Sequence, residues 1–214
     1  AIHTLWENEQ PEIMGRLIDM LQSDSDPEVR ATAAQHLGRF VLAGELGTLD
    51  PQTASQAVVC LLESWESEDN HLDIRRRSLE SIAYSGHENV PHFIRQASEH
   101  PDIKMRASAI FAMGRSADER WQVEVMDALF HQEPEIVFEA VRAAGELSIG
   151  EAVPRLIELL EHADREIKEA AIWALGETGG NAEESTRVDS PFLDPRGRPL
   201  SLRNPVIPPG WNPP

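Results

Sequence analysis

Three evenly spaced histidines are the first residues whose pattern suggests chemistry. His100, His131 and His162 stand 31 residues apart, and imidazole nitrogens are common metal ligands. A zinc ion needs its nitrogen ligands at about 2.0–2.1 Å, whereas equivalent positions on stacked helices lie about 8–10 Å apart. One ion therefore cannot bridge all three side chains. We expect imidazoles that close the C-termini of helices, with a pH-sensitive edge as the alternative.

Other residues with reactive side chains form no recognisable catalytic motif. His87 and His92 flank Glu88 and would make at most an adventitious surface metal site. The sequence contains no H-E-x-x-H, G-x-S-x-G, Walker, G-x-G-x-x-G or C-x-x-C motif. The single cysteine, Cys60, lies in an apolar run, where we expect a buried residue on a helix. We predict no catalytic residue, no metal site and no cofactor.

Two groups of side chains are candidates for binding a protein. Arg75, Arg76 and Arg77 form the only basic cluster; we expect a solvated helix face or a charge ladder between repeats, with an anion or carboxylate site as the alternative. Exposed tryptophans often mark interaction hot spots. Among the five tryptophans, Trp121 and Trp211 are the candidates for such a role.

The charge balance restricts the class of partner. The chain has 37 Asp and Glu against 19 Lys and Arg, a formal net charge of −18. Phosphate backbones and anionic membranes would repel such a protein. There is no apolar stretch of about 20 residues and no signal-peptide pattern at the start. Together with a lone cysteine, these features predict a cytoplasmic protein that binds neither nucleic acid nor membrane.

An internal repeat organises most of the chain. Five similar segments begin at Val29, Ile74, Met105, Ile136 and Ile167, with spacings of 45, 31, 31 and 31 residues. In each segment, small or apolar residues recur four, five and eight positions after this anchor, which is the pattern of an amphipathic helix. Glycine or alanine follows nine positions after the anchor and predicts a helix C-terminus. Acidic residues three positions before it predict N-terminal caps in four of the five segments.

A second set of amphipathic segments alternates with the first. These segments cover residues 11–22, 51–64, 88–99, 119–130 and 151–162. The longer first interval places 14 extra residues in a helix end and loop at 40–50, with Asp50 as N-cap and Pro51 as the first helical residue. The sequence therefore predicts stacked antiparallel helices, an α-solenoid.

The pattern D-x-x-V-R-x-x-A-A-x-x-L-G resembles HEAT repeats, specifically the short bacterial repeats of the phycobilin-lyase type. The resemblance covers residues 11–178 and implies an all-α, armadillo-like, right-handed superhelix of about five helical hairpins. Such repeats occur in scaffolds, adaptors, chromophore lyases and the metal-dependent deoxyhypusine hydroxylase. The hydroxylase's His-Glu pairs are missing from the corresponding columns here, so the resemblance implies no hydroxylase activity.

The C-terminal part has a different composition. We assign residues 1–178 to the solenoid and 179–214 to an extended tail, because eight of the 15 prolines and four arginines lie in 187–214. We expect the tail to cover the end of the solenoid through apolar side chains: Phe192, Leu193, Leu200, Leu202, Val206 and Ile207. The alternative is a polyproline segment that docks on a second chain.

The function expected from these features is a non-enzymatic interaction scaffold or adaptor. Its second helices would line a concave, acidic surface suited to a basic segment of a partner protein. One alternative, implied by the resemblance, is a bilin-lyase-like accessory protein for chromophore attachment. Another is a regulatory HEAT module of a larger protein.

Overall fold

The computed structural model describes residues 11–180, which form ten α-helices and two short 3₁₀ helices, with no strand among these residues. Five helices correspond to the predicted second set, and five to the anchored segments. In chain order the helices are α1 (Pro11–Ser23), α2 (Pro27–Glu45), α3 (Pro51–Glu66), α4 (Leu72–Ile82), α5 (Val90–Ser98), α6 (Ile103–Arg115), η2 (Glu119–Trp121), α7 (Gln122–Ala128), α8 (Pro134–Glu146), η3 (Gly150–Ala152), α9 (Val153–Leu159) and α10 (Arg165–Gly180).

The predicted helix starts are largely confirmed. The carboxylate of Asp26 accepts a hydrogen bond from the Glu28 N–H at 2.8 Å, and Asp102 does the same for Lys104 at 2.8 Å. These side chains satisfy amide groups that have no partner within the helix. Asp50 caps α3 by accepting from the Thr53 N–H at 2.9 Å, and Pro51 is the first helical residue, as predicted. Glu133, before α8, makes no such capping bond.

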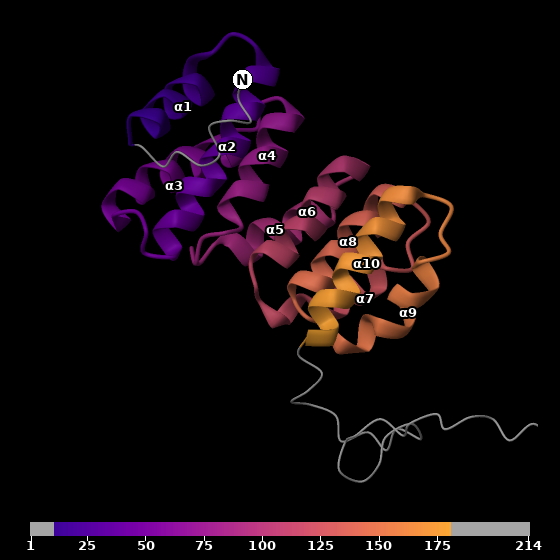
Figure 1. Ribbon diagram of the computed structural model, residues 1–214. Helices are drawn as coiled ribbons and strands as arrows, with labels where there is room; N and C mark the ends of the chain where they lie inside the picture. The colour runs from indigo at the N-terminus through magenta and orange to yellow at the C-terminus, as the bar shows by residue number, and fades with distance from the viewer. Residues whose placement is uncertain (1–10, 181–214) are drawn as a thin grey trace, which may run out of the picture. The chain divides into compact units, whose positions relative to one another are not determined.

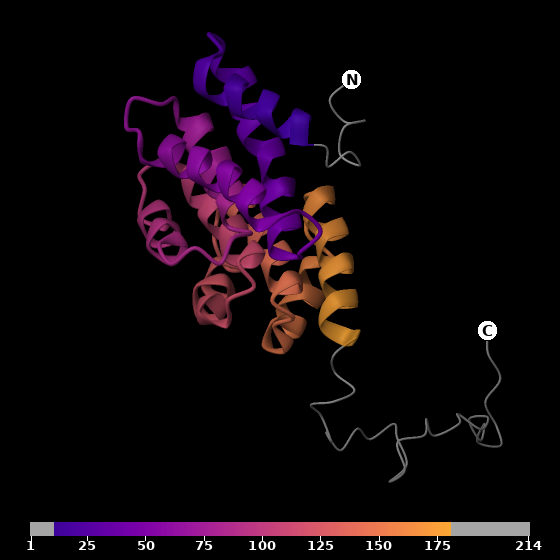
Figure 2. The ribbon, with the colours of Figure 1, turned by 90° about the vertical axis from the view of Figure 1, so that its left-hand side faces the viewer.

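The helices alternate between two layers (Figure 1). The anchored helices α2, α4, α6, α8 and α10 pack directly against one another in sequence order, and each odd-numbered helix packs against the even-numbered helix that follows it. Figure 2 is turned so that the side with α1 and α3 faces the viewer. The predicted all-α solenoid is therefore confirmed.

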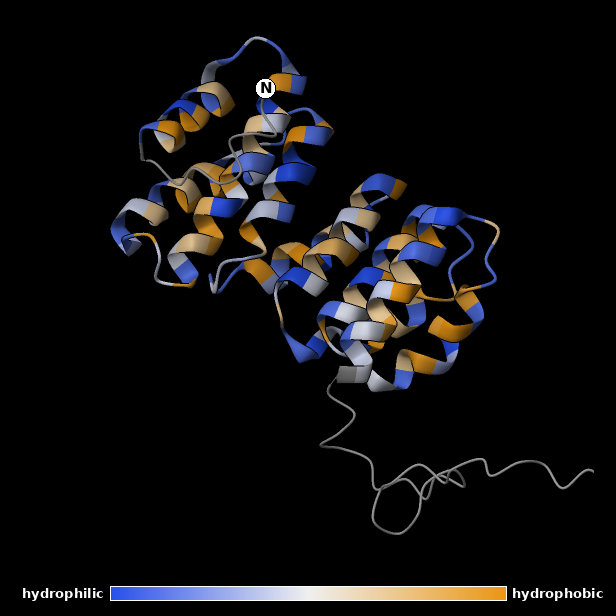
Figure 3. Ribbon diagram, viewed as in Figure 1, coloured by the Kyte–Doolittle hydropathy of each residue, from blue (hydrophilic) through white to orange (hydrophobic). Residues whose placement is uncertain are grey.

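Small residues on the anchored helices explain their close packing. Ala109, Ala140 and Ala171, four positions after the anchor, are each 0% exposed. An added Cβ at Gly114 would lie 2.8 Å from the Cα of Ala143, on the next anchored helix. Apolar residues recur along the helices in Figure 3, and the buried ones form one core cluster with members from all ten helices.

The glycines of the repeat differ from their predicted role. Gly38 lies seven residues before the end of α2, and Gly114 and Gly145 lie one residue before the ends of their helices. Their role is close approach of the next anchored helix, because the nearest backbone atoms to an added Cβ belong to Ser81, Ala143 and Ala174. The prediction that these glycines terminate the helices is therefore wrong for Gly38.

Several sequence predictions lie outside the described residues. They concern the proline-rich tail, its apolar side chains Phe192, Leu193, Leu200, Leu202, Val206 and Ile207, and Trp211. Within the described residues, none of the helices is both long and apolar enough to span a membrane.

Candidate interaction groove

A hollow in the described part of the chain forms a groove across four anchored helices. It has a volume of about 540 Å³ and receives side chains from α2, α4, α6 and α8. We call it the first-helix groove. A smaller hollow of about 370 Å³, lined by Phe138, Arg142, Glu166 and Trp173 among others, continues it from α8 onto α10.

The groove lies on the layer opposite to the one predicted. We expected the second helices, now α1, α3, α5, α7 and α9, to line the concave surface, and this is wrong. The anchored helices approach one another closely at Gly38, Gly114 and Gly145. Because this layer is more tightly spaced than the other, it forms the inner side of the stack.

The groove is also not acidic, which corrects a second expectation. It is lined by Arg39, Arg76, Arg77, Arg115 and Arg142 against Glu80, Glu135 and Glu139. Residues 11–180 contain 31 acidic and 15 basic side chains. The excess of acid therefore lies elsewhere, in part at the helix starts where carboxylates cap amides.

A buried polar network forms the floor of the groove at α4 and α6. The hydroxyl of Ser108 donates to the Glu80 carboxylate at 2.6 Å, and Arg76 Nε donates to the Ser108 hydroxyl at 3.0 Å. Arg76 Nε also contacts the carbonyl of Lys104 at 3.0 Å. Arg77 donates to Glu80 at 2.7 Å from the same helix. These bonds fix the orientation of two adjacent repeats, since each buried polar group has a partner.

Arginines stacked on aromatic rings form the opposite end of the groove. The guanidinium of Arg115 lies over the Phe111 and Tyr84 rings, 5.1 and 5.6 Å from their centroids. Arg142 lies over Phe111 and Phe138 at 5.6 and 5.8 Å. Such contacts hold a guanidinium in place while leaving its edge available for hydrogen bonds.

Two glutamates on α8 accompany these arginines. Glu146 pairs with Arg115 at 3.1 Å, whereas Glu139 lies 3.8 Å from Arg142 and its buried Oε2 accepts no hydrogen bond. Burial raises the pKa of Glu139 to about 7, with Arg142 opposing the shift and the Glu80 and Glu146 charges adding to it. Burial also raises the pKa of Glu146, against the attraction of Arg115 and Arg142. Glu139 is therefore partly protonated near neutral pH.

The side chains of the basic cluster predicted from the sequence point in different directions. Arg76 and Arg77 line the groove. Arg75 turns to the other layer, where its guanidinium donates to the carbonyl of Trp65 at 3.0 Å and lies over the Trp65 ring. Three consecutive residues on a helix point about 100° apart, so they do not form one anion site.

The predicted charge ladder between repeats is wrong. In the first three repeats, the arginine after the anchor instead donates to a backbone carbonyl at the end of the preceding second helix. Arg30 contacts Leu21 at 2.8 Å, Arg75 contacts Trp65, and Arg106 contacts His100 at 2.9 Å. Carbonyls without an intrahelical partner accept these bonds.

Each of the three evenly spaced histidines makes the same hydrogen bond within its own turn. Nδ1 of His100, His131 and His162 accepts the backbone N–H of the residue two positions on, each at 3.0 Å. The histidines follow second helices as expected, but their imidazoles accept from the start of the next helix rather than donating to the helix before. This contact requires an unprotonated Nδ1.

Two further sequence candidates are buried. Trp121 is 1% exposed, so the expectation of an exposed hot spot there is wrong; its ring packs below the Arg95 guanidinium, 5.6 Å away. Cys60 is buried on α3, as predicted, and burial raises the pKa of its thiol to about 11, with the Glu63 charge adding to the shift.

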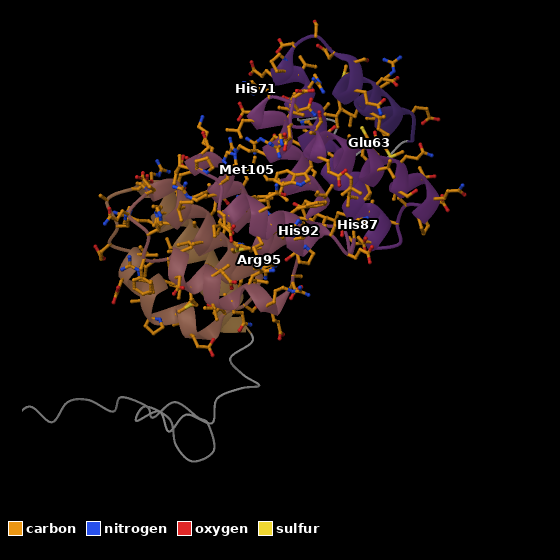
Figure 4. All side chains as sticks on the ribbon, turned by 180° about the vertical axis from the view of Figure 1, so that it is seen from behind. Glu63, His71, His87, His92, Arg95 and Met105 are labelled. Carbon is orange, nitrogen blue, oxygen red and sulfur yellow. The ribbon has the colours of Figure 1, made fainter. Side chains whose placement is uncertain are left out.

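The remaining histidines do not assemble a metal site. Figure 4 labels His87 and His92 close together at the start of α5. His87 Nδ1 accepts the Asn89 N–H at 3.3 Å. Within residues 11–180, no group of three or more His, Cys, Asp or Glu side chains is placed to hold a metal ion.

Sequence reasoning missed most of the groove, although the repeat contained the signal. Ten of the sixteen groove residues fall three, six or ten positions after an anchor: Arg77, Ser108 and Glu139; Gln35, Glu80, Phe111 and Arg142; and Arg39, Tyr84 and Arg115. Positions three and four apart lie on one helix face. These polar columns could have been recognised beside the apolar ones.

Comparison with protein families identifies the repeat. A model described as HEAT repeats matches residues 124–188, and a model described as HEAT repeat matches residues 13–43. These two stretches of the chain are HEAT repeats. No curated protein matches its sequence. HEAT proteins are built from stacked helical pairs, in agreement with the layers described above.

Solved structures share the fold at low sequence identity. The phycocyanin lyase complex of CpcE and CpcF from Nostoc sp. PCC7120 has a TM-score of 0.53 and 21% identity, covering 81% of this chain and 66% of that one. The chain thus spans just under two thirds of the lyase chain. A designed armadillo repeat protein in complex with the peptide (KR)4 has a TM-score of 0.47 and 18% identity, covering 77% of this chain and 81% of that one. Human deoxyhypusine hydroxylase has a TM-score of 0.46 and 17% identity, covering 82% and 77%.

These similarities concern the fold. At 21% identity, the similarity to the lyase complex shows a shared helical fold and no shared activity.

Proposed function

We propose that this protein is a non-enzymatic scaffold or adaptor that holds an extended segment of a partner protein in the first-helix groove. The observation that carries the proposal is the continuity of the groove across α2, α4, α6 and α8. An elongated ligand would meet the same columns of side chains in each successive repeat. Repeat proteins use such extended surfaces for binding.

We propose further that the bound segment carries carboxylate side chains. Five of the 15 basic residues of the described chain line the groove, against three of its 31 acidic residues. Arg115 and Arg142 are held by aromatic rings, so little side-chain entropy is lost when a carboxylate binds them. A carboxylate near either guanidinium would form a charge-assisted hydrogen bond.

A basic partner segment, as the sequence suggested, is the alternative. Its support is Glu139, whose Oε2 accepts no hydrogen bond among the described residues. A lysine or arginine donor would supply that bond and favour the ionised carboxylate. The two alternatives predict opposite charges on the preferred peptide.

Selection from a randomised phage-displayed peptide library against the full chain separates them. We expect enriched peptides to contain Asp and Glu, and their affinity to fall at least tenfold in Arg142→Glu. Arg120→Glu is the matched control, because Arg120 is 54% exposed at η2, outside the groove. Enrichment of Lys and Arg would support the basic segment. Equal binding by both variants would contradict a groove site.

A second candidate ligand is a bilin, which the protein would bind as an accessory protein for chromophore attachment. The observation that favours it is the combination of Arg77, Arg115 and Arg142 with the rings of Tyr84 and Phe111, because propionates need cations and a tetrapyrrole needs flat apolar contacts. Mixing the full chain with a free bilin should then shift and sharpen the visible absorbance band of the bilin. An unchanged spectrum, with and without an acceptor protein, would remove this candidate.

A further inference from the structure

Glu139 is a groove carboxyl group with one oxygen that makes no hydrogen bond to the described residues. This oxygen, Oε2, is buried, and it lies 3.8 Å from the Arg142 guanidinium, beyond hydrogen-bond distance. An ionised carboxylate that leaves water needs donors at both oxygens, whereas a neutral carboxyl group leaves its carbonyl oxygen unpaired at a smaller cost. The geometry therefore favours protonated Glu139, with the proton on Oε1, the oxygen that reaches the groove.

Four charged groups from three helices face Glu139: Arg142 and Glu146 on α8, Arg115 on α6 and Glu80 on α4. The two glutamates among them have close partners of their own. Glu80 lies 2.7 Å from Arg77, and Glu146 lies 3.1 Å from Arg115. Among the described residues that line the groove, none is a histidine. Titration of a histidine within the groove therefore cannot be mistaken for titration of Glu139.

The neighbouring Arg142 has N–H groups that bond to no described residue. Its contacts with Glu139 and Glu146 are 3.8 and 3.9 Å, both too long for hydrogen bonds. The rings of Phe111 and Phe138 hold the guanidinium in place. A guanidinium held in this way presents an edge of N–H donors that matches a carboxylate. Neutral Glu139 adds an O–H donor beside it, so the two side chains form a pair of donors suited to one carboxylate.

We propose that protonated Glu139 and Arg142 together bind one carboxylate of the partner segment, and that this binding takes up a proton from solvent. The inference rests on the proposed function, because it names the subsite of the first-helix groove that receives an acidic side chain. One oxygen of the ligand accepts from the Arg142 guanidinium, and the other accepts from the Oε1–H of Glu139. Ionised Glu139 has no proton to donate and repels the ligand. Glu139 therefore determines whether this subsite accepts a carboxylate.

The affinity of the subsite for a carboxylate should fall as pH rises. Burial raises the pKa of Glu139 to about 7, so its carboxyl group is mostly neutral at pH 6 and mostly ionised at pH 8. A bound carboxylate places another negative charge beside Glu139 and raises this pKa further. The dissociation constant should therefore increase by up to about tenfold between pH 6 and pH 8. A basic segment would show the opposite trend, because it favours ionised Glu139.

Isothermal titration calorimetry of the full chain with an acetylated hexaaspartate peptide tests the proposal. The aspartates stay ionised between pH 6 and pH 8, so the charge of the probe is constant. We expect several-fold tighter binding at pH 6 than at pH 8. At about pH 7.5 the measured heat should vary with the ionisation enthalpy of the buffer, in the direction of proton uptake. Equal affinity at both pH values, or proton release, would overturn the proposal.

Two variants assign the pH dependence to Glu139. Glu139→Gln keeps a donor at the same position without a titrating proton, so its affinity should be the same at pH 6 and pH 8. Glu135→Gln is the matched control and should keep the pH dependence, because Glu135 also lines the groove on α8 but is exposed. Persistence of the pH dependence in Glu139→Gln would overturn the inference alone. A failure of the peptide to bind at either pH would overturn the carboxylate-binding function, and this inference with it.

Discussion

At the scale of single residues, the arginine one position after the anchor joins the two helices of each of the first three hairpins. Arg30, Arg75 and Arg106 reach back to carbonyls at the end of the preceding second helix. A hydrogen bond from a charged donor is stronger than one between neutral groups. The basic column in the sequence is therefore explained by helix ends rather than by ion pairs between repeats.

Arg106→Met should lower the free energy of unfolding by about 1–3 kcal/mol, because the carbonyls of His100 and Pro101 lose their donor. Lys168→Met is the matched control, since Lys168 occupies the same column and its side chain makes no hydrogen bond to the described residues. Urea denaturation of both variants measures the difference. An equal loss in the two variants would contradict the carbonyl contact as the cause.

The buried carboxylate of Glu139 makes stability depend on pH. Its pKa is raised from 4.5 to about 7, so between these pH values the unfolded chain releases a proton that the folded chain retains. Glu139 therefore lowers the free energy of unfolding as pH rises through this window. Glu139→Gln should gain about 1–3 kcal/mol relative to the native chain between pH 4.5 and pH 8.

Denaturant unfolding at pH 4.5 and pH 8 tests this expectation. Glu135→Gln, on the same helix and exposed, is the control and should show a smaller change with pH. If Glu139→Gln shifts stability by the same amount at both pH values, the carboxylate is not protonated in the folded groove.

Cys60 should be inert in the folded protein. A pKa of about 11 leaves roughly one thiol in a thousand ionised at pH 8, and the side chain is also buried. We expect 5,5′-dithiobis(2-nitrobenzoate) to react with it only at the rate of unfolding. Rapid reaction under native conditions would show that α3 opens or that the thiol is exposed.

At the scale of helices, glycine controls the distance between repeats. Gly145 faces α10, where an added Cβ would meet the Cα of Ala174 at 2.9 Å and the Trp173 ring at 2.7 Å. A backbone atom cannot rotate away, so the helices must separate. The groove depends on this spacing because it extends across the same helices.

Gly145→Ala should therefore destabilise the protein by about 1–3 kcal/mol despite alanine's higher helix propensity. Gly15→Ala is the matched control, in α1 with no atom within 4 Å of an added Cβ, and it should stabilise by up to about 1 kcal/mol. Thermal unfolding followed by circular dichroism compares them. Stabilisation by both substitutions would contradict the close helix approach.

The sequence predicted the helices and their alternation but not which layer forms the groove. The anchors and their small columns show which side chains are buried, and this was sufficient for residues 11–178. Which layer forms the inner side of the stack depends on the distances between whole helices. Contacts such as Gly38 with Ser81 and Gly145 with Ala174 set these distances. The exposure of Trp121 was predicted wrongly for a related reason. Its position in the sequence did not reveal that Arg95, on another helix, covers its ring.

At the scale of the whole molecule, net charge and local charge have opposite signs. The chain carries −18, yet its groove has more arginines than acidic residues. At physiological ionic strength, charges beyond about 8 Å are largely screened. The groove therefore determines which segment binds, while the total charge still disfavours polyanions such as nucleic acids at long range.

If partners bind in the first-helix groove, site-specific photo-crosslinking from a groove residue will capture them. Benzoylphenylalanine would replace Phe111, in the groove, or Phe130, which is 61% exposed outside it, in the full chain within its native cell. The two positions match in side chain and differ in location. We predict a discrete protein adduct from position 111 that is missing from position 130. Adducts from position 130 alone, or the same adducts from both, would contradict the account.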